Sequence, residues 1–87
     1  MPIIKSAKKR MRQDIRRRAD NRQRRSTLRT AIRRLREAIE AGDTAAVKTR
    51  WSETQGLLDR TARLGIIHPN AAARTKSRLA RRIQKLS

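Results

Sequence analysis

The sequence predicts an all-α protein, a three-helix antiparallel bundle with a long basic first helix that projects beyond it. Apolar residues recur at helical spacing in three segments, and turn-forming residues separate these segments. No alternation of apolar and polar residues is long enough to indicate a strand. A chain of 87 residues fits a single domain, residues 1–87.

The first helix is expected over about residues 7–41, with Ser6 as its N-cap. Its second half carries an apolar stripe at spacings i, i+4, i+7 and i+11, formed by Leu28, Ile32, Leu35 and Ile39. A thinner stripe in the first half points about 120° away, at roughly 100° per residue. It consists of Ala7, Met11, Ile15 and Ala19. The two halves therefore should not share one packing seam.

The second helix is expected over about residues 44–64, because Gly42 suits a helix C-cap and Asp43 an N-cap. Its apolar stripe is formed by Val47, Trp51, Thr54 and Leu58. Trp51 lies on that stripe, which favours packing in the core over stacking on a nucleic-acid base.

The third helix is expected over about residues 71–86, with Asn70 as its N-cap. Its apolar side is formed by Ala72, Leu79, Ile83 and Leu86. At 1.5 Å per residue the first helix is roughly 50 Å long and its partners about 25–30 Å. Near half of the first helix must therefore extend past the bundle, where core packing cannot hold it.

The charge is strongly unbalanced, with 25 Lys and Arg against 7 Asp and Glu and a formal net charge of +18. Residues 1–30 carry +10, residues 31–60 carry +1 and residues 61–87 carry +7. Self-repulsion of this size opposes a compact state, and the scarcity of large apolar residues leaves only a small core. A polyanionic partner that contacts both ends of the chain is therefore expected.

Cations surround the first half of the first helix, as a rod inserted between several nucleic-acid segments requires. They are Lys8, Lys9, Arg10, Arg12, Arg16, Arg17, Arg18, Arg22, Arg24 and Arg25. In the third helix the cations recur on one side, opposite the apolar side, at Arg74, Arg78, Arg81 and Lys85. This one-sided row is called the third-helix rail below.

Catalysis and metal binding are not expected. The chain has no Cys and a single His, His68, which lacks a paired nucleophile or a second ligand. No cofactor is therefore predicted, and the protein is expected not to be an enzyme. The apolar pair Ile3 and Ile4 is far too short for a signal peptide or a membrane span, so an intracellular protein without a membrane partner is expected.

Arg outnumbers Lys, and aromatic residues are limited to Trp51, a composition that favours recognition of folded RNA by shape and phosphate position. Four other classes stay open on the composition. They are a basic-region zipper, a nonspecific nucleoid-type DNA-binding protein, a membrane-active peptide and a helical adaptor for acidic proteins. The zipper would end within two heptads at Gly42, and the first helix lacks the broad apolar face of a membrane-active peptide.

Two separated motifs resemble the ribosomal protein S20 family of the bacterial small subunit. The first is Ile4-Lys5-Ser6-Ala7-Lys8-Lys9-Arg10, and the second runs from Gly65-Ile66-Ile67-His68-Pro69-Asn70 into Ala72-Ala73-Arg74-Thr75-Lys76-Ser77-Arg78-Leu79. Between them, Arg17, Asn21, Ser26, Leu28 and Thr30 fit the family's pattern. The chain departs from it at Pro69 and Ala71, where a lysine is often found, and at Trp51.

The resemblance implies a cytoplasmic structural constituent of the small ribosomal subunit that binds 16S ribosomal RNA. The expected contacts are chiefly with the RNA's 5′ domain and the long stem near its 3′ end, and with other subunit components by proximity, without a homo-oligomer. It also implies RNA-facing roles for Lys5, Ser6, Lys8, Lys9, Arg10, Arg74, Lys76, Ser77 and Arg78. With the remaining cations, the candidate RNA-binding residues are Lys5, Ser6, Lys8, Lys9, Arg10, Arg12, Arg16, Arg17, Arg18, Arg22, Arg24, Arg25, Arg29, Arg74, Lys76, Ser77, Arg78, Arg81 and Lys85.

Overall fold

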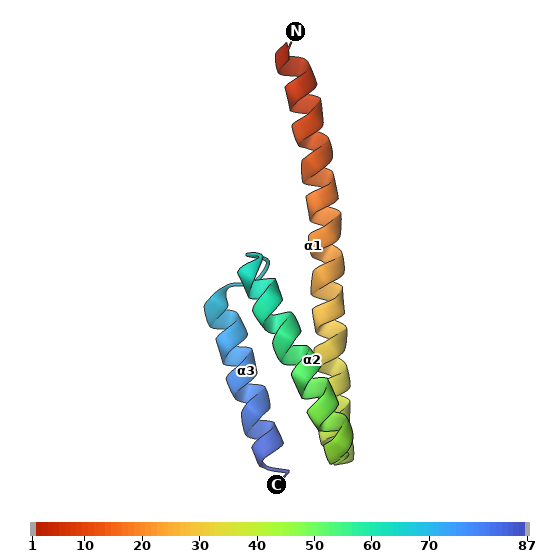
Figure 1. Ribbon diagram of the computed structural model, residues 1–87, viewed down its shortest axis with the longest axis vertical. Coiled ribbons are helices and arrows are strands. Elements are labelled where there is room, and N and C mark those ends of the chain that lie inside the picture. Colours follow the sequence, from red (N-terminus) through yellow and green to blue (C-terminus); the bar gives the residue numbers. More distant parts are fainter. Residues whose placement is uncertain (1, 87) are drawn as a thin grey trace.

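Three helices follow one another along the chain: α1 (Pro2–Ala41), α2 (Thr44–Arg63) and α3 (Pro69–Gln84). The computed structural model describes residues 2–86, and the side chains of residues 6–86. Within residues 2–86 no strand occurs, so the predicted all-α class is confirmed. Figure 1 shows α2 returning beside the second half of α1, and α3 lying along α2 in the direction of α1.

Both turns end their preceding helix in the same way. Gly42 and Gly65 have φ of 71° and 76°, which glycine adopts without steric cost. At the first turn Gly42 N donates to Ile39 O, and Asp43 N donates to Ala38 O. At the second turn Gly65 N donates to Ala62 O, and Ile66 N donates to Thr61 O. These paired bonds form the Schellman motif, which satisfies the last carbonyls of each helix. Asp43 then caps α2 as predicted, since its side chain accepts from Ala46 N.

The predicted starts of α1 and α3 were wrong, because both N-caps were placed too far along the chain. α1 begins at Pro2, so Ser6 lies inside the helix, and α3 begins at Pro69 with His68 as its N-cap. His68 Nδ1 accepts from Asn70 N at 3.0 Å, so Asn70 is the second residue of the helix. Proline suits both starts because its fixed φ matches a helix and its missing N–H would be unpaired there in any case.

The C-terminal ends also differ from the prediction by one or two residues. α2 ends at Arg63 and α3 at Gln84, with Lys85 as the C-cap. Leu64 and Leu86 therefore lie outside the helices and are 49% and 36% exposed. Leu86 does not continue the apolar side of α3.

The core lies where the second half of α1 meets α2 and α3. Its central cluster consists of Leu35, Ile39, Val47 and Leu79, with Ala38, Trp51 and Ile83 packed against it. Trp51 is half-buried there, which confirms its predicted packing in the core. The other buried apolar residues are Leu28, Leu58, Ile66 and Ala72. Buried Thr54 and Thr61 donate their hydroxyls to the carbonyls of Arg50 and Leu57, so neither leaves an unpaired polar group.

The first half of α1 extends beyond the bundle, as the lengths predicted (Figure 1). The longest dimension is 65 Å and the radius of gyration is 17.6 Å. A compact chain of this length has a radius of about 12 Å. Met11 and Ile15 on the thinner stripe are 63% and 62% exposed, so that stripe packs against neither α2 nor α3.

Replacing Leu35 with Ala should destabilise the bundle by about 2–5 kcal/mol, because Leu35 has no exposed surface and its removal leaves a cavity. Urea unfolding followed by Trp51 fluorescence measures this loss. Met11→Ala is the matched control, since Met11 is exposed and the expected change is within about 0.5 kcal/mol. Equal effects of the two substitutions would contradict the assigned core.

In the free protein at low salt, amide protons of the first half of α1 should exchange much faster than those of its second half. Like charges on every side repel, and no packing offsets that repulsion. Hydrogen exchange measured by NMR, with circular dichroism for helicity, tests this. Added NaCl should raise the helicity because it screens the repulsion. Full helicity and uniform protection at low salt would contradict the prediction.

Candidate nucleic-acid interface

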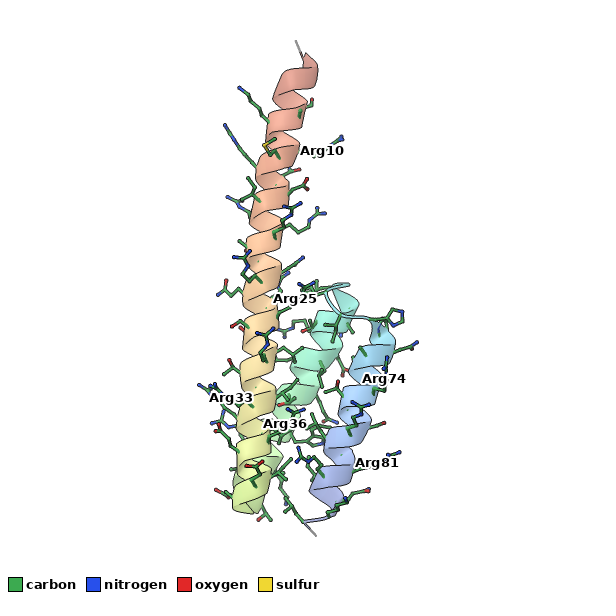
Figure 2. All side chains as sticks on the ribbon, turned by 180° about the vertical axis from the view of Figure 1, so that it is seen from behind. Arg10, Arg25, Arg33, Arg36, Arg74 and Arg81 are labelled. Atoms are coloured by element: carbon green, nitrogen blue, oxygen red, sulfur yellow. The ribbon has the colours of Figure 1, made fainter. Side chains whose placement is uncertain are left out.

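The first half of α1 presents its side chains to solvent on all sides. From Ser6 to Thr27 every side chain is exposed except that of Asn21, which is half-buried. Figure 2 shows Arg10 on this free part of the helix, away from α2 and α3. All the predicted cations of this half are exposed here, although the side chain of Lys5 lies outside the described residues. A segment accessible from every side can contact several polyanionic surfaces at once.

The carboxylates of this half do not neutralise its cations. Asp14 and Asp20 are both exposed, and neither makes an ion pair with another described residue. The ion pairs of the described chain lie in the bundle instead. They join Arg33 to Glu37, Arg50 to Glu53 and Lys76 to Asp59. The positive field is therefore strongest along the projecting half of α1.

Where α1 enters the bundle, four of its arginines lie on one face of the helix. Arg18, Arg22, Arg25 and Arg29 follow the spacing i, i+4, i+7 and i+11, and with Asn21 and Ser26 they line a surface hollow of about 490 Å³. The polar groups of the hollow are four guanidinium groups, an amide and a hydroxyl. This hollow suits a phosphate backbone better than an apolar ligand.

A larger groove of about 650 Å³ lies between α1 and α2. Its cations are Arg22 and Arg34 from α1 and Arg50 from α2, and its hydroxyl groups come from Ser26, Thr27 and Thr30. Arg50 Nη1 lies 3.5 Å from Glu53 Oε2, which offsets part of the charge. The candidate set omits Arg34 and Arg50 because residues 31–60 are nearly neutral as a whole.

The third-helix rail lies on α3 and at its C-cap. Arg74, Arg78, Arg81 and Lys85 are all exposed, and Figure 2 shows Arg74 and Arg81 on the outer side of α3. Arg78 also lines a small cleft with Arg36 of α1 and Arg82. The spacing still places the four cations on one face of α3, with Arg78 beside the cleft.

The other two candidates of α3 differ in their surroundings. Ser77 is exposed, whereas the Lys76 ammonium lies 3.0 Å from the Asp59 carboxylate of α2. The side chains of Lys76 and Asp59 are 34% and 52% exposed, so this ion pair lies at the surface. Another anion can replace Asp59 as the partner of Lys76 there.

Sequence reasoning also left Arg33, Arg36 and Arg82 out of the candidate set, although all three are exposed. Two of them continue patterns already visible in the sequence. Arg36 follows Arg29 by seven residues on the same face of α1, and Arg82 follows Arg78 by four on α3.

Among residues 6–86, no group of His, Asp and Glu side chains could hold a metal ion. His68 is occupied as the cap of α3. Within residues 2–86, none of the helices combines the length and apolar character that a membrane crossing requires.

A small core that supports a helix with exposed cations on every side, none ion-paired from Ser6 to Thr27, is typical of a structural nucleic-acid-binding protein. Comparison with known sequences narrows the class. The sequence model of the family described as ribosomal protein S20 matches residues 2–84. The small ribosomal subunit protein bS20 of Rhodopirellula baltica is 52% identical over 79 residues, covering 91% of this chain and 88% of that protein.

The chain belongs to the ribosomal protein S20 family. It is therefore a structural protein of the small ribosomal subunit, located with the ribosome in the cytoplasm, and it is not an enzyme.

Proposed function

We propose that the chain binds directly to 16S ribosomal RNA and stabilises its folding by neutralising phosphates and inserting the first half of α1 between RNA segments. One observation carries this proposal: residues 6–27 expose cations on every side of a helix that neither α2 nor α3 covers. A helix resting on one flat surface needs cations on one side only. Cations on every side of the helix fit a helix that contacts RNA on several sides.

The candidate residues divide into two contact regions under this proposal. The first comprises Lys5, Ser6 and the cations from Lys8 to Arg29 on α1. The second comprises the exposed cations of α3, with Lys76 exchanging Asp59 for a phosphate. Guanidinium groups bind phosphates through two parallel hydrogen bonds, which fixes the orientation of the helix as well as its charge. One copy of the protein would then hold RNA elements at a set spacing.

The RNA elements proposed as ligands are the 5′ domain and the long stem near the 3′ end, with neighbouring subunit components touched by proximity. The family resemblance supports this choice. Fluorescence anisotropy with separate transcripts of the 5′ domain, the stem and an unrelated folded RNA tests it, with duplex DNA as competitor. Tightest binding to the 5′ domain is expected. Equal affinity for all four nucleic acids would contradict the assignment to these elements.

The affinity for the 5′-domain transcript should fall steeply with salt, because binding releases counterions from each neutralised phosphate. If six to ten phosphates are engaged, the loss between 50 and 200 mM salt is roughly 10³–10⁵-fold. Anisotropy titrations at several NaCl concentrations give the slope. A nearly salt-independent affinity would eliminate phosphate neutralisation as the mechanism.

Replacing Arg74 and Arg78 with Ala should weaken RNA binding and lower the salt slope by about two, since each lost phosphate contact lowers it by about one. Helicity should stay unchanged, because both residues are exposed and Ala favours a helix. Arg60→Ala with Arg63→Ala is the matched control. It removes the same charge from exposed positions of α2 outside the candidate set, and should weaken binding less. Loss of helicity in the α3 variant would show that its faces are wrongly assigned.

A further inference from the structure

Three arginines from two helices converge on one small cleft in the bundle. Arg36 of α1 lies opposite Arg78 and Arg82 of α3, and the cleft between them has a volume of about 190 Å³. Its other lining residues are Thr75 and Leu79. Leu79 is 2% exposed, and the Thr75 hydroxyl donates to Ala71 O at 3.0 Å. The three arginines thus line the cleft together with a buried leucine and a threonine whose hydroxyl is already paired.

These three arginines have no carboxylate partner among the described residues. Glu37 lies 3.9 Å from Arg33, and Asp59 is held by Lys76. Glu40 stands one turn after Arg36 but makes no ion pair with a described residue. The cleft therefore gathers three like charges, none of which is ion-paired with a described residue.

The arrangement also differs from that of other arginines on the same helices. Figure 2 shows Arg33 on the outer side of α1 and Arg74 and Arg81 on the outer side of α3, whereas Arg36 lies on the side of α1 that faces the other helices. Helix α3 packs chiefly against α2 and meets α1 much less. The cleft is thus one of the few places where α1 and α3 approach each other, and repulsion acts there.

We propose that Arg36, Arg78 and Arg82 form a binding site for one phosphate group of the RNA backbone, and that the bound phosphate fastens α3 to α1. This inference rests on the proposed function for the identity of the ligand. A phosphate accepts hydrogen bonds from several guanidinium forks at once, and the charge on both partners strengthens each bond. The same anion replaces repulsion between α1 and α3 with attraction to a shared partner. RNA binding and closure of the bundle are then coupled.

The test uses the full chain and two triple variants. The inner variant carries Arg36→Gln, Arg78→Gln and Arg82→Gln. The outer variant carries Arg33→Gln, Arg74→Gln and Arg81→Gln, which also removes one charge from α1 and two from α3. Thermal unfolding is followed by Trp51 fluorescence in millimolar inorganic phosphate and in NaCl of equal ionic strength.

Phosphate should raise the Tm of the wild type and of the outer variant by a few degrees, because it binds the folded state. The inner variant should show no such rise, and its Tm in NaCl should equal or exceed that of the wild type because the repulsion is gone. Hydrogen exchange on the wild type gives a readout without substitutions. Phosphate should increase the protection of the α3 amides.

Equal Tm rises in all three proteins would indicate diffuse charge or a general salt effect and would overturn the site. Absence of a rise in the wild type, or an inner variant less stable than the wild type in NaCl, would overturn it too. The RNA titrations separate the two proposals. Steep, salt-dependent RNA binding without a phosphate effect leaves the proposed function standing alone. A phosphate effect without RNA affinity keeps the anion site but removes RNA as its ligand.

Discussion

Repulsion among like charges is the constraint on which the rest of this structure depends. A net charge of +18 on 87 residues cannot be placed around a small core without opposing its formation. The chain places its core and its densest positive charge in different parts of the molecule. The apolar residues that pack are concentrated in the second half of α1, in α2 and on one side of α3, while the densest cations stand on the half of α1 that has no core beneath it.

The carboxylates follow the same separation. Glu37, Glu53 and Asp59 pair with cations of the bundle, and Asp43 caps α2. Surface ion pairs contribute at most about 1 kcal/mol each, so their main effect is to lower the positive potential where the helices must pack. Along residues 6–27 few carboxylates remain to lower the positive potential. Only the middle of the chain, residues 31–60, is nearly neutral, and the two ends carry almost all of the net charge.

Continuity of α1 joins these two parts. Because one helix runs from Pro2 to Ala41, the direction of its free half is set by the packing of Leu28, Leu35 and Ile39 on α2 and α3. The spacing between the cations of α1 and those of α3 is therefore set by the core. A flexible basic tail could carry the same number of cations but would not fix their positions relative to those of α3.

Much of the fold was determined by the sequence alone, because the features involved are local. The three helices, the turn at Gly42 and Asp43, and the burial of Leu35, Val47 and Leu79 follow from residue spacing and cap chemistry. The exposure of the cations along the first half of α1 follows from helix lengths. The wrong helix starts were local as well: Pro2 and Pro69 open helices, and His68 does the capping predicted for Asn70.

Only the tertiary structure decided which charges meet. Asp59 of α2 pairs with Lys76 of α3. Arg36 of α1 shares a cleft with Arg78 and Arg82 of α3, although they lie far apart in the sequence. Helical periodicity assigns each residue to a face of its own helix, but it does not say which flank of that helix a neighbour occupies. That depends on how the core side chains of different helices interlock, and it placed Arg78 of the third-helix rail at the same cleft as Arg36 of α1.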